Sequence, residues 1–310
     1  MIPAEFTYHR PGSKGEALQL LGRYGDDGRV LAGGHSLIPM MKLRMATPAH
    51  LVDITRIGEL KGVSFSGGPI EIGALTTQAA LIASEELARA CPIIRETASQ
   101  IADPQVRYCG TIGGNVGNGD PGNDMPALMQ CLDARFVLET ARGTREVAAR
   151  DFYQGPFVTA LVPGEMLTMI RIPAPPAGHG WAYKKLKRKV GDYATAAAAV
   201  ILEMSGGTVH KASIALTNLG PTPLYAKAAV DRITGTALDA SDIDAAAAAA
   251  EAIARPSDDG RGTADYRRKM AGVMVRRALT EAKARAGDIT PPADAATPKS
   301  GGGMFGWLRG

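Results

Sequence analysis

Two short glycine-rich segments constrain this chain more than any other feature of its sequence. The first, AGGHS at 32–36, stands between a strand-like run at 29–32 and a predicted helix at 37–44 that Ser36 can cap. The second, TIGGN at 111–115, lies in a glycine-rich stretch at 110–123 that we expect to be one long loop. Two such segments suit a ligand with two halves, such as a dinucleotide.

Glycines in such segments suggest a phosphate site. Backbone N–H groups at a helix N-terminus are unpaired, and paired glycines leave room for a phosphate to touch the main chain. Each hydrogen bond to a charged acceptor contributes about 1.5–3 kcal/mol. Two other interpretations stay open: a plain strand-to-helix turn at 32–36, and a mobile surface loop at 110–123.

One motif match is misleading. GNGDPG at 117–122 fits G-x-G-x-x-G, the nicotinamide dinucleotide fingerprint, which requires a hydrophobic strand before it. The residues before it are TIGGNV, and Pro121 has no N–H to donate. We therefore reject it. A nicotinamide-dependent Rossmann dehydrogenase remains the less favoured alternative, together with a non-catalytic nucleotide-binding module.

Length and composition predict two soluble domains. The chain has 310 residues, 45% of them hydrophobic, and no apolar run approaches the roughly 20 residues of a membrane span. Its first residues lack a basic segment followed by an apolar run, so we expect a cytoplasmic protein. The basic run at 184–189 has no interleaved aromatic residues, which favours a solvated edge or an interface over nucleic acid.

The cysteines and histidines argue against a metal site in this chain. Three cysteines, Cys91, Cys109 and Cys131, are widely spaced, whereas iron–sulfur clusters and structural zinc need clustered thiolates. The five histidines show no ligand spacing. An odd cysteine count also argues against a disulfide framework.

The predicted elements change character in the middle of the chain, at the proline-rich segment 172–178. Before it we expect strands at 50–54, 136–139 and 165–172, a hairpin at 63–73, a helix at 84–101 and a helix at 125–132 capped by Asp124. After it we expect three antiparallel strands at 181–187, 194–204 and 208–217, followed by helices at 223–233, 242–254 and 264–286. This pattern predicts an α+β fold.

The glycine segments and several longer stretches resemble one family. The chain is similar to the FAD-binding medium subunits of aerobic molybdenum–copper carbon monoxide dehydrogenases, within the xanthine dehydrogenase (molybdenum hydroxylase) family. The resemblance runs almost continuously to about residue 286. It is carried by HRPGS (9–13), HLVDI (50–54), IADPQVRYCGTIGGN (101–115), GDPGNDMPALMQCL (119–132), YKKLKRKVGDYATAAAAV (183–200), SIALTNLG (213–220) and YRRKMAGVMVRRA (266–278).

The resemblance implies a fold. We expect a vanillyl-oxidase-like (PCMH-type) FAD-binding domain at 1–175, made of two α/β subdomains at about 1–55 and 56–175. A C-terminal flavoprotein domain with a three-stranded antiparallel sheet and helices would follow at 178–286. We expect a flexible tail at 287–310.

The resemblance also implies a role in a larger enzyme. The chain would carry non-covalent FAD and transfer electrons from the [2Fe–2S] clusters of a small subunit to a quinone or another acceptor. A large subunit would hold the molybdenum–copper centre that oxidises carbon monoxide, in a dimer of heterotrimers. No residue of this chain is expected to be catalytic. The alternative within the family is a complex that acts on a xanthine- or aldehyde-type substrate.

The same resemblance implies a set of FAD-binding residues. The first segment would hold the pyrophosphate and the second would clasp it. Asp124 would bond a ribityl or ribose hydroxyl, and Leu161 would cover the adenine end. Lys185, Asp192 and Tyr193 would meet the isoalloxazine, although Lys185 and Asp192 also fit a surface ion pair, and Leu161 fits the core. The whole predicted set is Ala32, Gly33, Gly34, His35, Ser36, Leu37, Thr111, Ile112, Gly113, Gly114, Asn115, Asp124, Leu161, Lys185, Asp192 and Tyr193.

The last residues suggest a contact with a membrane-associated partner. Residues 304–309 (MFGWLR) place three large apolar groups beside one cation after a Gly-Gly-Gly run. Exposed groups of this kind favour association, so we expect them to dock the electron acceptor or the inner face of the cytoplasmic membrane. A tail folded back on its own subunit is the alternative.

Overall fold

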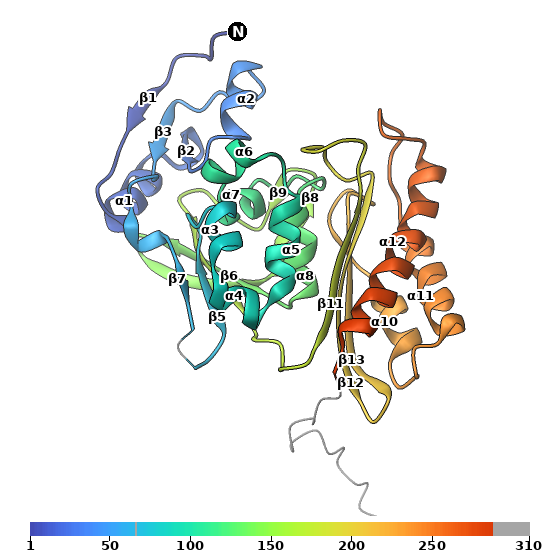
Figure 1. Cartoon of the computed structure of the whole chain (residues 1–310). Helices are drawn as coiled ribbons and strands as arrows, with labels where there is room; N and C mark the ends of the chain where they lie inside the picture. Colours follow the sequence, from blue (N-terminus) through green and yellow to red (C-terminus); the bar gives the residue numbers. More distant parts are fainter. Residues whose placement is uncertain (66, 288–310) are drawn as a thin grey trace, which may run out of the picture.

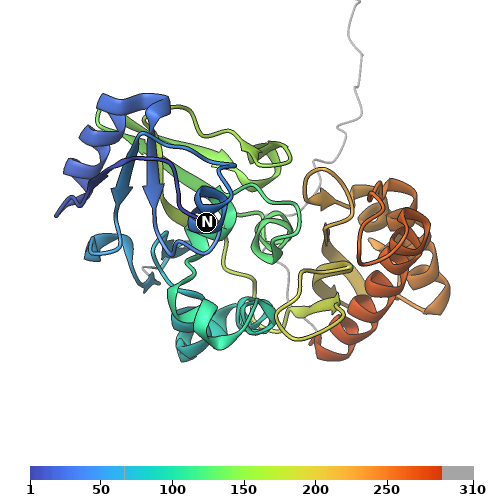
Figure 2. The same ribbon diagram turned by 90° about the horizontal axis from the view of Figure 1, so that it is seen from above.

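The structure is a computed structural model, and it describes residues 1–65 and 67–287. The predicted docking segment 304–309 therefore lies outside the described residues. Within the described residues the chain forms three parts. The N-terminal subdomain and the C-terminal domain lie on opposite sides of a central subdomain (Figure 2).

The N-terminal subdomain is built on a small parallel sheet with strand order β1-β3-β2 (Figure 1). Its first helix was absent from the sequence-based expectation. The Ser13 side chain starts this helix by accepting a hydrogen bond from the Glu16 N–H, and Leu18 and Leu21 pack with Val52 of the sheet. The elements are β1 (Thr7–His9), α1 (Lys14–Tyr24), η1 (Gly25–Asp27), β2 (Gly28–Leu31), α2 (Leu37–Lys42), β3 (His50–Asp53) and η2 (Gly58–Leu60).

The central subdomain combines an antiparallel sheet, ordered β4-β5-β10-β6-β7, with short helices. Its core joins sheet residues such as Ile72, Phe136 and Ile170 to helix residues such as Ile94 and Leu128. The elements are β4 (Val63–Ser64), β5 (Ile70–Gly73), α3 (Gln78–Ala83), α4 (Glu85–Ala90), α5 (Pro92–Gln100), α6 (Pro104–Cys109), α7 (Ile112–Gly117), α8 (Asp124–Cys131), β6 (Arg135–Thr140), β7 (Gly143–Ala148), α9 (Ala149–Phe152), β8 (Tyr153–Gly155), β9 (Val158–Thr159) and β10 (Met166–Ile172).

The C-terminal domain holds an antiparallel sheet, ordered β11-β12-β13-β14, between two helical layers. Helices α5 and α8 of the central subdomain contact one side, and α10 to α12 cover the other (Figure 1). The elements are β11 (Gly180–Leu186), β12 (Ala196–Ser205), β13 (Thr208–Thr217), β14 (Leu224–Tyr225), α10 (Lys227–Ile233), α11 (Ala240–Ile253) and α12 (Ala264–Arg285).

Strand β12 explains how this sheet is buried on both faces. Ala197 and Ala199 belong to the core of the central subdomain, whereas Ala196 and Ala198 belong to the core of the C-terminal domain. Successive side chains of a strand point to opposite faces, and alanine leaves room for a helix on each. The alanine-rich sequence thus lets one sheet join the two domains.

Two expected helices had wrong bounds, one strand was missed, and the sheet of the C-terminal domain has four strands rather than the expected three, because β14 pairs with β13. The helix at 84–101 is two helices, because Pro92 lacks an N–H and Cys91 takes an extended φ of −150° before it. The helix at 223–233 begins at Lys227, since residues 224–225 pair with β13. Strand β7 was missed because its side chains are mostly exposed and show no apolar alternation. Among the described helices, none is both long and apolar enough to cross a bilayer.

Candidate cofactor site

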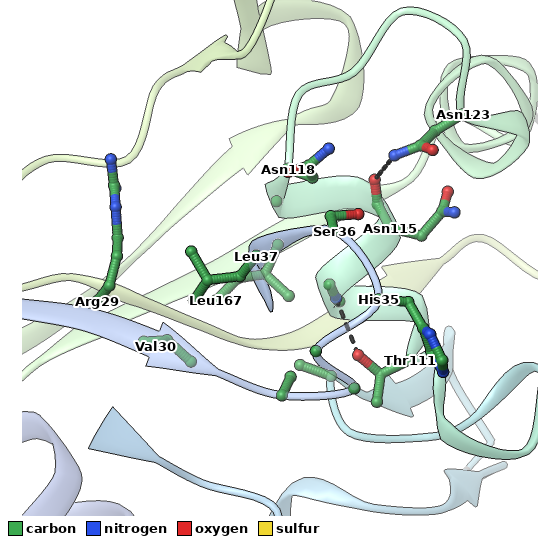
Figure 3. A pocket seen from close by; sticks show the side chains of 18 of the residues that line it. Arg29, Val30, His35, Ser36, Leu37, Thr111, Asn115, Asn118, Asn123 and Leu167 are labelled. Atoms are coloured by element: carbon green, nitrogen blue, oxygen red, sulfur yellow. Dashed lines mark hydrogen bonds between the residues drawn. The ribbon is translucent and has the colours of Figure 1, made fainter. Parts of the chain in front are cut away.

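The two glycine-rich segments meet in one cleft of about 620 Å³ (Figure 3). All three parts of the chain contribute to its wall. The segment after β2, the region from α7 to α8, and residues 185 and 191–193 all line it. Every predicted cofactor-binding residue lies in this wall except Ile112, which is fully buried in the core of the central subdomain. Ile112 is therefore a core residue.

The first segment offers a row of free hydrogen-bond donors. The structure records no acceptor among residues 1–65 and 67–287 for the backbone N–H groups of residues 33–37. The Ser36 side chain makes no capping bond, contrary to expectation, and it lines the cleft with Leu37 (Figure 3). Gly34 has φ of +75°, which glycine adopts without strain. A run of unpaired amides in a cleft suits an anionic ligand.

The second segment uses its amides internally. We expected this segment to be part of one long loop, but it forms the start of helix α7. Thr111 caps the first turn of this helix, because its side chain accepts a hydrogen bond from the Gly114 N–H at 3.0 Å. The Ile112 N–H donates to the Thr76 carbonyl and the Gly113 N–H to the Ala74 carbonyl, each at 2.9 Å. These bonds order a glycine-rich stretch that sequence reasoning treated as irregular. They also leave the amides of residues 112–114 engaged with protein.

The glycines of the two segments allow backbone contact. A Cβ at Gly33 would overlap the Cys109 carbonyl and lie 2.9 Å from the Gly110 Cα. A Cβ at Gly113 would lie 2.6 Å from the Ala74 Cβ. At both glycines, protein atoms fill the space that a side chain would take. Gly33 holds the first segment against the turn before Thr111, and Gly113 holds α7 against the end of β5.

Asp124 and Lys185 form a buried ion pair that joins α8 to β11. Asp124 is the first helical residue of α8 rather than its cap. One carboxylate oxygen accepts from the Tyr183 hydroxyl at 2.5 Å, and the other pairs with Lys185 Nζ at 2.7 Å. The Lys185 side chain is 1% exposed, so the surface-pair alternative is excluded for it. Burial, together with Asp124, raises the pKa of Tyr183.

Asp192 and Tyr193 lie at the rim of the same end of the cleft. Asp192 bonds the half-exposed Arg188 at 2.8 Å, while its own side chain is only 8% exposed. The Tyr193 ring packs on Gly122, where a Cβ would lie 2.9 Å from Cδ1. Burial and the neighbouring Asp120 carboxylate raise the pKa of Tyr193. Tyr193 is 42% exposed and lines the cleft.

Sequence reasoning missed several polar residues of the wall, among them Asn118 and Asn123 (Figure 3). The Asn123 amide donates to the Asn115 carbonyl at 2.8 Å and so ties the end of α7 to the start of α8. Both asparagines stand next to the rejected G-x-G-x-x-G match or within it. That segment follows helix α7 instead of a strand, so its structural context is not that of a nicotinamide fingerprint.

Of the three free cysteines, Cys109 is exposed. Cys91 and Cys131 are buried, and burial raises the pKa of Cys91 strongly and that of Cys131 to about 12. In the described part of the chain, no three His, Cys, Asp or Glu side chains gather as a metal site would require.

The groups that line the cleft match the chemical groups of FAD. Free amides at residues 33–37 match a pyrophosphate, while Lys185 and the Tyr193 ring, on a different domain, match a ring system with polar edges. The cleft connects these two sets without interruption.

Comparisons with known proteins give the same result. Residues 4–175 match the FAD binding domain in molybdopterin dehydrogenase, and residues 181–282 match the CO dehydrogenase flavoprotein C-terminal domain. The chain is 63% identical to the carbon monoxide dehydrogenase medium chain of Afipia carboxidovorans, over 92% of this chain and 99% of the relative. It is 51% identical to the corresponding chain of Hydrogenophaga pseudoflava, over 92% and 99% of the two chains.

A solved structure agrees with the sequence comparison. A crystal structure of cyanide-inactivated Cu,Mo-CO dehydrogenase contains a chain with 63% identity and a TM-score of 0.91, covering 92% of this chain and 100% of that one. The α+β fold with two flavoprotein domains is therefore confirmed. The chain belongs to the family of FAD-binding subunits of molybdopterin dehydrogenases that includes the carbon monoxide dehydrogenase medium chains.

Proposed function

We propose that the chain is the FAD-carrying electron-transfer subunit of a molybdenum hydroxylase complex of the carbon monoxide dehydrogenase type. The observation that carries this proposal is the row of unpaired amides at residues 33–37, in a cleft that extends to Lys185 and Tyr193 of the C-terminal domain. Bound FAD would accept electrons from the [2Fe–2S] clusters of a small subunit and deliver them to a quinone or another acceptor. Carbon monoxide oxidation would take place on the large subunit.

The residues of the cleft would divide the work of binding. The amides of residues 33–37 would hold the pyrophosphate, and Ala32 would lie against it. Residues 111–115 would fix the first segment in place, with Asn115 reaching the ligand. Leu161 would lie at the adenine end, and Asp124, Lys185, Asp192 and Tyr193 at the flavin end. These groups bind and orient the cofactor and set its electrostatic surroundings.

A visible spectrum of the purified protein tests the cofactor. We expect flavin absorption bands and about one FAD per chain. Acid precipitation should release all of the yellow chromophore into the supernatant, because no histidine or cysteine stands in a motif suited to covalent attachment. A colourless protein would contradict the proposal, and colour left in the pellet would contradict non-covalent binding.

Purification of the native complex tests the partners and the substrate. We expect a large and a small subunit to co-purify with this chain as a dimer of heterotrimers, and carbon monoxide to reduce an artificial dye. Reduction by xanthine or an aldehyde, but not by carbon monoxide, would assign the complex to another member of the family.

Removal of residues 304–310 tests delivery to the acceptor. If these residues dock a membrane-associated partner, the truncated complex should keep its FAD and its dye-linked activity but reduce membrane quinone more slowly. Equal quinone reduction by the truncated and full-length complexes would exclude this docking role.

A further inference from the structure

The C-terminal end of helix α5 forms part of the cleft wall. Ile101 and Ala102 follow the helix directly and line the cleft on the same side as Lys185. The last carbonyl groups of a helix lack intrahelical partners and carry a partial negative charge of about half a unit. Without nearby cations, these carbonyl groups would disfavour any negative charge that develops on a ligand bound in the cleft.

Three cations converge on these carbonyl groups. Lys185 Nζ lies 3.3 Å and Lys187 Nζ 3.5 Å from the Gln100 carbonyl oxygen. Arg107 donates to the carbonyl groups of Ile101 at 2.9 Å and Ala102 at 3.2 Å. The three side chains come from β11, the residue after it, and α6. We call Lys185, Lys187 and Arg107 the cationic collar.

The charges of the collar do not cancel. Asp124 pairs with Lys185 at 2.7 Å, and it is the single carboxylate among the charges that act on Lys187 within the described residues. With Asp124 set against Lys185, and about half a negative charge at the helix end, Lys187 and Arg107 leave the C-terminal end of α5, and the part of the wall formed by Ile101 and Ala102, net positive, although neither cation lines the cleft itself. Burial is the main cause that lowers the pKa of Lys187, and the like charges of Lys185 and Arg107 lower it further.

We propose that Lys187 and Arg107 are positioning residues that raise the reduction potential of the bound flavin. This inference rests on the function proposed above. Uptake of two electrons and one proton converts neutral oxidised flavin into a singly charged anion. A net positive wall stabilises that anion relative to the oxidised form. Resemblance to the family places Lys185 among the cofactor-binding residues, but Asp124 neutralises its charge. The excess positive charge therefore comes from Lys187 and Arg107, which are not among the predicted cofactor-binding residues.

The magnitude follows from Coulomb's law. At an effective dielectric constant of about 20, one unit charge near a bound ligand changes an equilibrium constant by roughly tenfold. For a two-electron couple, a tenfold change corresponds to about 30 mV. A shift of this size is measurable by redox titration.

The test compares charge removal at matched lysines in the full complex with its FAD bound. Lys187→Gln keeps a donor for the Gln100 carbonyl and removes the charge. Lys184→Gln is the control, because Lys184 is a neighbouring lysine of β11 that pairs with Glu281 of α12 instead. Lys187→Arg restores the charge, and Arg107→Gln tests the second cation. Redox titration followed through the flavin signals gives the midpoint potential, and FAD content and melting temperature are measured for each variant.

We expect the flavin equilibrium to move about tenfold toward the oxidised form in Lys187→Gln and in Arg107→Gln. Lys184→Gln and Lys187→Arg should stay close to the wild-type potential. An unchanged potential in Lys187→Gln, or an equal shift in Lys184→Gln or Lys187→Arg, would overturn the inference while leaving the proposed function intact. A wild-type complex without flavin would overturn both.

Discussion

At the scale of single residues, two glycines hold the cofactor site together by lacking a side chain. Gly33 lets the N-terminal subdomain touch the central subdomain at Cys109–Gly110, and Gly113 lets α7 touch Ala74 within the central subdomain. Their contribution is contact between protein segments, and the row of unpaired backbone donors lies in the first segment, at residues 33–37. Stability and cofactor binding are therefore coupled at these positions.

The first prediction concerns Gly33→Ala. Its methyl group would overlap the Cys109 carbonyl, and overpacking of this kind costs about 1–3 kcal/mol. We expect a lower free energy of unfolding in urea together with loss of FAD. Gly15→Ala is the control, because this glycine of α1 has no atom within 4 Å of the added Cβ and should keep both properties. A Gly33→Ala protein as stable as the wild type but without FAD would show that the methyl group acts on the ligand instead.

At the scale of elements, the long helix α12 lies directly on strand β11. Gly180 makes this contact, since a Cβ there would overlap the Ala282 carbonyl and lie 2.9 Å from the Ala286 Cβ. At the same end of the helix, Arg285 donates to the Trp181 carbonyl and lies over the Trp181 ring at 3.7 Å. Close packing and this cation–π contact position the helix over the sheet.

The second prediction concerns Gly180→Ala. The added methyl group would push α12 away from β11, and we expect the free energy of unfolding to fall by about 1–3 kcal/mol. Gly143→Ala is the matched control, because Gly143 is also a strand glycine but has open space at its Cβ. The control should be neutral or slightly stabilising. Urea denaturation of both variants makes the comparison, and equal midpoints would contradict the packing argument.

At the scale of the whole molecule, polar contacts join the central subdomain to the C-terminal domain. Asp124 of α8 binds Tyr183 and Lys185 of β11, as described above. On α5, Glu96 accepts from the Tyr183 N–H at 2.8 Å and from Arg285 of α12 at 2.8 Å. Asp124 and Lys185 line the cleft from the two sides of this interface, so the interface and the site share this contact.

The third prediction concerns Asp124→Asn. This change leaves the Lys185 ammonium buried without a counter-charge, which costs about 3–5 kcal/mol. We expect a large fall in the urea midpoint of the full-length chain. Asp231→Asn is the control, because the Lys227–Asp231 pair is exposed and such pairs contribute at most about 1 kcal/mol. Equal effects of the two changes would show that the buried pair is not a main support of the interface.

Much of the fold was predictable from local sequence patterns. The alanine-rich strand β12, the strand β13 and the helix α12 follow from periodicity and turn residues, because these act between near neighbours in the chain. Of the cofactor-binding residues that the resemblance predicted, all but one line the same cleft in the structure. Ile112 was the exception, since its motif neighbours line the cleft while its own side chain points into the core.

The sequence by itself determined the family, the element pattern and the segments that form the cleft. Tertiary structure decided which atoms of those segments are available. The amides at 33–37 are free and those at 112–114 are not, because residues 74 and 76, distant in sequence, supply the acceptors for 112 and 113. Likewise, only folding brings Asp124 to Lys185, and Lys187 and Arg107 to the end of α5. Hydrogen bonds and charges act over a few ångströms in space, and no local pattern records which distant groups will come that close.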